Sequence, residues 1–168
     1  DLINPCSSLN ADDRLELRET RHLYLALESL QREVEQWIDM QSLWPHNVTS
    51  IARKWLSEGL RERSISRDLN WGIRVPLPGW DGKVFYVWFD APIAYISITM
   101  DWAQAKGDPN GWERWWLQPE EVRLVQFMAK DNVPFHAVFW PAVMIGTRQL
   151  WTMPNYIKGY NWLTYEGN

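Results

Sequence analysis

An aspartate followed closely by a proline occurs twice in the second half of the chain, each time after an apolar stretch. The two strings are DAP at 90–92 and DNVP at 131–134. Proline suits the first turn of a helix, because its missing N–H would have no partner there. Each string therefore predicts a strand that ends where a helix begins. Ligands bind at such strand ends in open α/β sheets, so we expect a crevice between the two junctions.

Aromatic side chains surround both junctions. His136 and Trp140 are four residues apart on the second expected helix and share one of its faces. If that helix packs beside the first junction, they would form a single aromatic pocket with Trp88, Tyr95 and Phe135. A flexible, polarisable group suits such a pocket, because a thioether gains about 0.3–1.5 kcal/mol from each ring contact.

A carboxylate is expected at the edge of this pocket. Asp131 follows Lys130 at the start of the second helix, where it would accept hydrogen bonds from ribose hydroxyls or orient an ammonium group. The simpler alternative is structural: Asp90 and Asp131 would be helix N-caps, and the aromatic rings would be ordinary core residues. The spacing of the residues does not choose between these two interpretations.

The elements that must position these residues follow from the hydrophobic pattern. The run from Val84 to Phe89 is apolar or aromatic without polar alternation, which is typical of a strand buried on both faces of a parallel sheet. Further strands are expected at 122–128 and 156–163, with helices from Pro92 and over 134–145 between them. This alternation of strands and helices predicts an α/β fold with a parallel sheet.

The first half of the chain is expected to be mostly helical. Apolar residues recur at helical spacing after Glu28, and a second helix is expected from Asn47, a good N-cap residue, to Gly59. Short strands are expected at 15–20 and 22–27, a polar loop at 61–68, and a domain boundary near residue 80.

Composition narrows the class of protein. The 168 residues suffice for one domain or parts of two, and the net charge of −4 gives no overall basic field for nucleic acid. The single cysteine excludes an internal disulfide, and no apolar run reaches the ~18 residues of a membrane span. We therefore expect a cytoplasmic protein without a membrane partner. Because the first residue is Asp1 rather than Met, we expect an internal piece of a longer protein.

Six strings along the chain occur in the same order in one enzyme family. They are DLINP at 1–5, RET-x-HLYL at 18–25, ISRDL-x-WG at 65–72, VFYVWFDAPI-x-Y at 84–95, FMAKDNVPFH at 127–136 and FWP at 139–141. On these strings the sequence resembles the methionyl-tRNA synthetases, a family of class I aminoacyl-tRNA synthetases. The resemblance spans nearly the whole chain, and the fourth and fifth strings together are specific to this family.

The resemblance implies a fold, a division into domains and an activity. Residues 1–80 would be the C-terminal part of the connective peptide, a mostly helical remnant of that insertion, and residues 81–168 the second half of the Rossmann-type catalytic domain. The family activates methionine with ATP, together with magnesium, to methionyl adenylate, and then transfers methionine to tRNA(Met). Methionine, ATP and, through the full-length protein, tRNA(Met) are the partners that the resemblance implies.

The resemblance also implies roles for individual residues. The methionine pocket would be lined by Trp88, Ala91, Pro92, Tyr95, Asn132, Phe135, His136 and Trp140. Asp131 and Arg67 match positions that take part in activation, and Lys130 and Asp131 would contact ATP. The family uses no protein nucleophile, so its rate comes from positioning and from charge stabilisation around the α-phosphate.

The sequence lacks two motifs of the family and a second cysteine near Cys6. The H-I-G-H and K-M-S-K-S motifs, which contact ATP, are absent, so the chain alone is not expected to activate methionine. Cys6 has no second cysteine nearby, so no zinc site is expected within the chain.

The alternative function is a synthetase-like binding module without catalysis, which loss of both motifs from the full-length protein would favour. An unrelated α/β domain with a tryptophan-rich binding surface is the third interpretation.

Overall fold

The apolar stripes of the first half form two helices that pack together. In the computed structural model, which describes residues 6–7, 10 and 12–165, a 3-10 turn η1 (Leu27–Leu30) leads into α1 (Gln31–Asp39), and α2 (His46–Ser57) follows. Both helices were expected from the sequence. The N-cap of α2 is Pro45 rather than Asn47, because the Asn47 amide instead donates to the carbonyl of Gly159, at 2.8 Å. The string DLINP and the end of the C-terminal tail lie outside the described residues.

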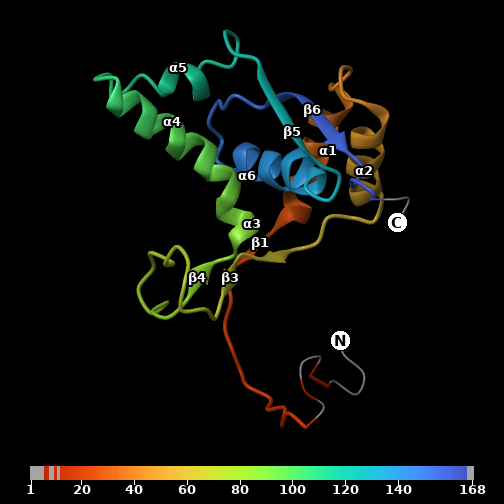
Figure 1. The fold of residues 1–168 in the computed structure, drawn as a ribbon, viewed down its shortest axis with the longest axis vertical. Helices are drawn as coiled ribbons and strands as arrows, with labels where there is room; N and C mark the ends of the chain where they lie inside the picture. Colours follow the sequence, from red (N-terminus) through yellow and green to blue (C-terminus); the bar gives the residue numbers. More distant parts are fainter. Residues whose placement is uncertain (1–5, 8–9, 11, 166–168) are drawn as a thin grey trace.

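The second half contains a parallel strand pair joined by a helix. Strand β5 (Leu124–Ala129) runs parallel to β6 (Pro154–Tyr160), and the connection holds the π-helical turn η3 (Phe135–Phe139) and α6 (Trp140–Gly146). The Trp140 N–H donates to the Phe135 carbonyl five residues back, so a π turn immediately precedes Pro141, which has no N–H to give. The expected strand–helix–strand unit and the α/β class are confirmed (Figure 1).

The expected buried strand at 84–89 is wrong. Strand β4 covers only Val84–Phe85, and it pairs antiparallel with β3 (Ser66–Arg67) rather than joining the parallel pair. Helix α3 (Val87–Asp90) replaces the rest of the run. Trp88 and Asp90 therefore lie on a helix and not at the end of a parallel strand.

Three further corrections concern the first half. Residues 61–68, expected as a loop, contain β3 and also β2 (Arg63–Ser64), which pairs antiparallel with β1 (Tyr24–Leu25). The strand expected at 22–27 shrinks to those two residues of β1, and residues 15–20 form no strand. Residues 15–20 are exposed, and their segment leads away from the body of the molecule (Figure 1).

An arm of helices leaves the β3–β4 pair. The 3-10 turn η2 (Ala91–Ile93) continues α3 into α4 (Ala94–Ala105), and α5 (Glu113–Trp116) follows at the far end of the arm (Figure 1). The helix expected from Pro92 is thereby confirmed. Among the described residues, no helix combines the length and the apolar character needed to cross a membrane.

Two groups of buried apolar residues hold these elements together. The larger joins η1, α1 and α2 to η3, α6 and β6, so residues on both sides of position 80 contribute to one core. The smaller contains Ile96, Trp116, Trp140 and Met144 and attaches the arm of α4 and α5 to α6. Helices α4 and α6 are thus fixed relative to each other, and Phe89 of α3 packs against the larger group, which positions the aromatic residues discussed next.

Candidate functional site

The structure places the five aromatic side chains of the expected pocket in two contact groups. Trp88 of α3 stacks on Phe135 of η3, with ring centroids 4.7 Å apart and planes inclined by 14°. Tyr95 of α4 lies 5.8 Å from both His136 and Trp140. Phe135 and His136 are consecutive on η3, so the backbone of this turn places the two contact groups next to each other. We call these five residues the aromatic cluster.

One member of the aromatic cluster is a buried, hydrogen-bonded histidine. His136 is 5% exposed, and its Nδ1 is 3.0 Å from the carbonyl oxygen of Asn132. A carbonyl only accepts, so Nδ1 carries the proton, and Nε2 accepts from the Tyr95 hydroxyl at 3.0 Å. Burial lowers the pKa of His136, against the opposing effect of the Asn132 carbonyl. Burial also raises the pKa of Tyr95. Both groups are therefore neutral at pH 7.

This neutral histidine makes the stability of the chain sensitive to acid. The unfolded chain takes up a proton near the ordinary value of 6.5, whereas the folded ring does so only at a lower pH. The free energy of unfolding should therefore fall as the pH drops below 6.5 towards the folded-state pKa, by at most about 1.4 kcal/mol per pH unit. Urea unfolding at a series of pH values measures this slope.

Replacement of the histidine should remove that acid sensitivity. In His136→Gln the slope from this site should vanish, because the glutamine side chain does not titrate. His46→Gln, on the exposed surface of α2, is the matched control and should keep the slope. An undiminished slope in His136→Gln would mean that the acid sensitivity arises elsewhere.

Two other predicted pocket residues form the turn between Trp88 and Tyr95. Ala91 and Pro92 belong to η2, where Pro92 is buried. Asp90 immediately precedes them and makes no side-chain capping hydrogen bond, and burial raises its pKa. The proposed N-cap role of Asp90 is therefore not supported by a hydrogen bond.

Asp131 and Lys130 lie at the exposed end of strand β5. The Asp131 carboxylate accepts from the indole Nε1 of Trp162 at 3.5 Å, and the Lys130 ammonium lies 4.7 Å from the centre of the same indole. The N-cap of η3 is Pro134, so Asp131 is not the cap of that turn. Its carboxylate is exposed and thus accessible to a polar ligand.

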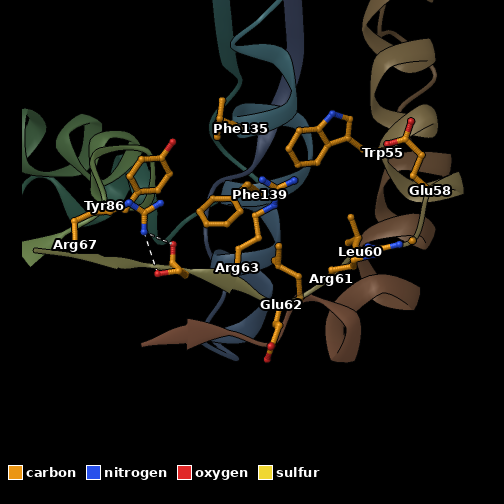
Figure 2. Close-up of a pocket in the computed structure, with 13 residues that line it drawn as sticks. Trp55, Glu58, Leu60, Arg61, Glu62, Arg63, Arg67, Tyr86, Phe135 and Phe139 are labelled. Carbon is orange, nitrogen blue, oxygen red and sulfur yellow. Dashed lines mark hydrogen bonds between the residues drawn. The ribbon is translucent and has the colours of Figure 1, made fainter. Parts of the chain in front are cut away.

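Arg67 is held beside a cavity of about 830 Å³ (Figure 2). Its Nη1 donates to the carbonyl and hydroxyl of Ser64, at 3.1 and 3.0 Å, and to the carbonyl of Ser66, at 2.7 Å. Its guanidinium also stacks 4.0 Å above the ring of Tyr86. Within the described residues, Nε and Nη2 have no acceptor, so these two donors are available to a ligand.

This cavity adjoins the aromatic cluster. Phe135 lines the cavity and also stacks on Trp88, so one ring of the aromatic cluster forms part of the cavity wall. On the opposite side from Tyr86, Trp55 lines the cavity (Figure 2). The guanidinium of Arg63 stacks on this ring, 4.5 Å from its centroid. No group of three or more histidine, cysteine or acidic side chains is arranged to hold a metal ion in the part of the chain that the structure describes.

Comparison with known proteins identifies the family. The sequence profile of the family described as tRNA synthetases class I (M) matches residues 1–168. The chain belongs to this synthetase family.

Individual synthetases of this family align with almost the entire chain. Methionine–tRNA ligase 1 of Acaryochloris marina is 52% identical over 167 residues, which cover 99% of this chain and 30% of the relative. Methionine–tRNA ligase of Cereibacter sphaeroides is 53% identical over 178 residues, covering 99% and 31%. The chain thus spans about 30% of the length of these curated relatives.

Solved structures of a synthetase share the fold. Mycobacterium tuberculosis methionyl-tRNA synthetase bound by methionyl-adenylate superimposes with a TM-score of 0.64 at 24% identity, over 83% of this chain and 26% of that one. Its free state gives a TM-score of 0.62 at 23% identity with the same coverage. At this identity the similarity concerns the fold.

Several residues around the candidate site were not singled out from the sequence. The cavity beside Arg67 is lined by Tyr86, which lies between β4 and α3, by Trp55 of α2 and by Phe139 of η3. The alternation of Ile65 with serines and arginines in RSISR is the signal of extended backbone that the loop interpretation overlooked.

Proposed function

We propose that this chain is the part of a methionine–tRNA ligase that forms much of the methionine pocket. The observation that carries the proposal is the aromatic cluster, in which Trp88 stacks on Phe135 and Tyr95 donates to a buried, neutral His136. The complete protein would use ATP, with magnesium bound to it as a substrate, to form methionyl adenylate, and would then acylate tRNA(Met) in the cytoplasm. Residues 1–80 are proposed as the end of the connective peptide, and residues 81–168 as the second catalytic half.

The proposed pocket matches the chemistry of a methionine side chain. Ring faces and edges contact a thioether favourably, and the flexible side chain adapts to an irregular apolar space. The proposed lining residues are Trp88, Ala91, Pro92, Tyr95, Asn132, Phe135, His136 and Trp140. A neutral histidine matters here, because an imidazolium beside an apolar substrate would be left without a counter-charge.

The proposed activation step joins the methionine carboxylate to the α-phosphorus of ATP and releases pyrophosphate. Arg67 offers Nε and Nη2 to the charge that develops on the phosphate oxygens, since three acceptors already hold Nη1. Asp131 and Lys130 are proposed to contact ATP, through ribose hydroxyls and phosphate respectively.

Calorimetric titration with methionine tests the pocket, with leucine as the competing apolar amino acid. We expect selective methionine binding and, in the full-length protein, a methionine KM raised at least tenfold in Trp88→Ala, because that variant loses the stacked ring and leaves a cavity beside Phe135. Trp102→Ala, a tryptophan on α4 outside the aromatic cluster, is the matched control. An unchanged KM in Trp88→Ala would remove this residue from the pocket.

The alternative, a binding module without catalysis, makes a different prediction. It shares the methionine binding and the effect of Trp88→Ala on affinity, but its full-length protein would not exchange pyrophosphate into ATP. Methionine-dependent pyrophosphate exchange therefore separates the two functions.

A further inference from the structure

A cluster of polar side chains next to Arg67 has no role in the proposed pocket. Asp68 follows Arg67 directly, and its carboxylate accepts from the Lys83 ammonium and, at 2.6 Å, from the Thr20 hydroxyl. The His22 Nε2 lies 3.5 Å from the same carboxylate. Ser66, on the other side of Arg67, has its hydroxyl 3.1 Å from the His22 Nδ1. We call Thr20, His22, Ser66, Asp68 and Lys83 the Asp68 clasp.

The hydrogen bonds of the Asp68 clasp are mutually consistent. The Ser66 hydroxyl oxygen accepts from the Leu23 N–H at 2.9 Å, so its own proton is free to go to the His22 Nδ1. His22 then directs its Nε2–H at Asp68. Ser66 is 0% exposed, so this serine, histidine and aspartate cannot form a nucleophilic site. The interactions with Lys83 and Thr20 lower the pKa of Asp68, which keeps its carboxylate charged.

The Asp68 clasp includes both sequence neighbours of Arg67 and a residue of the segment that pairs with it. In the β3–β4 pair Arg67 lies opposite Val84, so Lys83 reaches across the end of the pair to Asp68. The Lys83 side chain is only 14% exposed, unlike those of ordinary surface lysines. The peptide groups on both sides of Arg67 are therefore fixed by contacts that involve none of the four aromatic rings lining the cavity.

We propose that the Asp68 clasp positions Arg67 for the activation step, with Asp68 and Lys83 as positioning residues. This inference rests on the proposed function, because it concerns the role of Arg67 in that reaction. Arg67 already uses Nη1 to donate to the carbonyls of Ser64 and Ser66, so the direction of Nε and Nη2 depends on the backbone of residues 66–68. A displacement of about 1 Å at such a group costs on the order of 10²-fold in rate.

The test compares Asp68→Asn and Lys83→Met in the full-length protein by methionine-dependent pyrophosphate exchange. Each variant should lower kcat at least tenfold while the methionine KM changes less than twofold, and Lys83→Arg should restore most of the rate. In an Arg67→Ala background neither substitution should lower the rate further, because both act through Arg67. Asp39→Asn, which removes the exposed ion pair with Arg53, is the matched control and should leave kcat unchanged.

The inference would be overturned by kcat losses below threefold, or by equal losses in the presence and absence of Arg67. A second measurement does not require activity. The heteronuclear NOE of the Arg67 Nε–H should report an ordered side chain in the wild type and a mobile one in Asp68→Asn. If the wild type exchanges no pyrophosphate, the proposed function fails, and this NOE alone decides whether Asp68 positions Arg67: unchanged order in the variant would refute it.

Discussion

Replacement of Arg67 by alanine should lower the rate of adenylate formation by about 10²- to 10³-fold, the typical cost of removing one preorganised donor to developing charge. The methionine KM should change far less, because Arg67 does not belong to the aromatic cluster, which meets the cavity beside Arg67 at Phe135. Pyrophosphate exchange in the full-length protein measures both quantities. If Arg67→Ala forms adenylate at the wild-type rate, Arg67 takes no part in activation.

A lysine at position 67 should not restore the rate of adenylate formation. The guanidinium combines three hydrogen bonds from one nitrogen with a stacked contact on Tyr86, and a lysine ammonium offers no planar face for that contact. Arg67→Lys should therefore remain close to Arg67→Ala in rate. Arg53→Ala provides the control for loss of a positive charge, since Arg53 makes only an exposed ion pair with Asp39.

Part of this fold could be predicted from local sequence patterns. The amphipathic helices α1 and α2 have apolar residues at regular helical spacing, which fixes both their type and their buried face. The unit from β5 through α6 to β6 was likewise predicted, because a strand, a proline-initiated helix and a second strand follow each other along the chain. The contact of Trp88 with the residues of η3 also agrees with the expected aromatic cluster, although its binding of methionine stays a prediction.

The central apolar run shows where local patterns fail. A short continuous apolar segment has no periodicity that separates a buried strand from a buried helix. In this chain the backbone is extended as far as Tyr86, whose N–H donates to the Ile65 carbonyl at 2.9 Å, and a helical turn begins at Val87. The decisive partner is about twenty residues away, so the run itself carries no signal of where the pairing stops.

The surroundings of Arg67 depend on still more distant residues. Strand β2 pairs with β1, with Tyr24 opposite Ser64, and the Asp68 clasp draws on Thr20 and Lys83 from separate segments. Antiparallel pairing between such short strands leaves no periodic pattern in the sequence. The resemblance to the synthetase family pointed to Arg67 itself, whereas its supporting residues required the structure.

Replacement of Trp140 by alanine should have the largest effect on stability, a loss of about 3–5 kcal/mol in the free energy of unfolding. Trp140 is 1% exposed and contacts Tyr95 and Trp116, at 5.8 and 5.9 Å between ring centroids. The substitution would leave a large cavity where α4 and α5 pack against α6. Because a domain is typically stable by only about 5–15 kcal/mol, such a loss approaches global unfolding.

Urea unfolding followed by far-UV circular dichroism measures this loss, and the chain offers a control of the same residue type. Trp71 is 88% exposed, so Trp71→Ala should change the free energy of unfolding by less than about 0.5 kcal/mol. A change as small as this in Trp140→Ala would mean that the helical arm does not depend on Trp140 for its attachment. In that case the position of Tyr95 on α4, and its hydrogen bond to the buried His136, would not depend on Trp140 either.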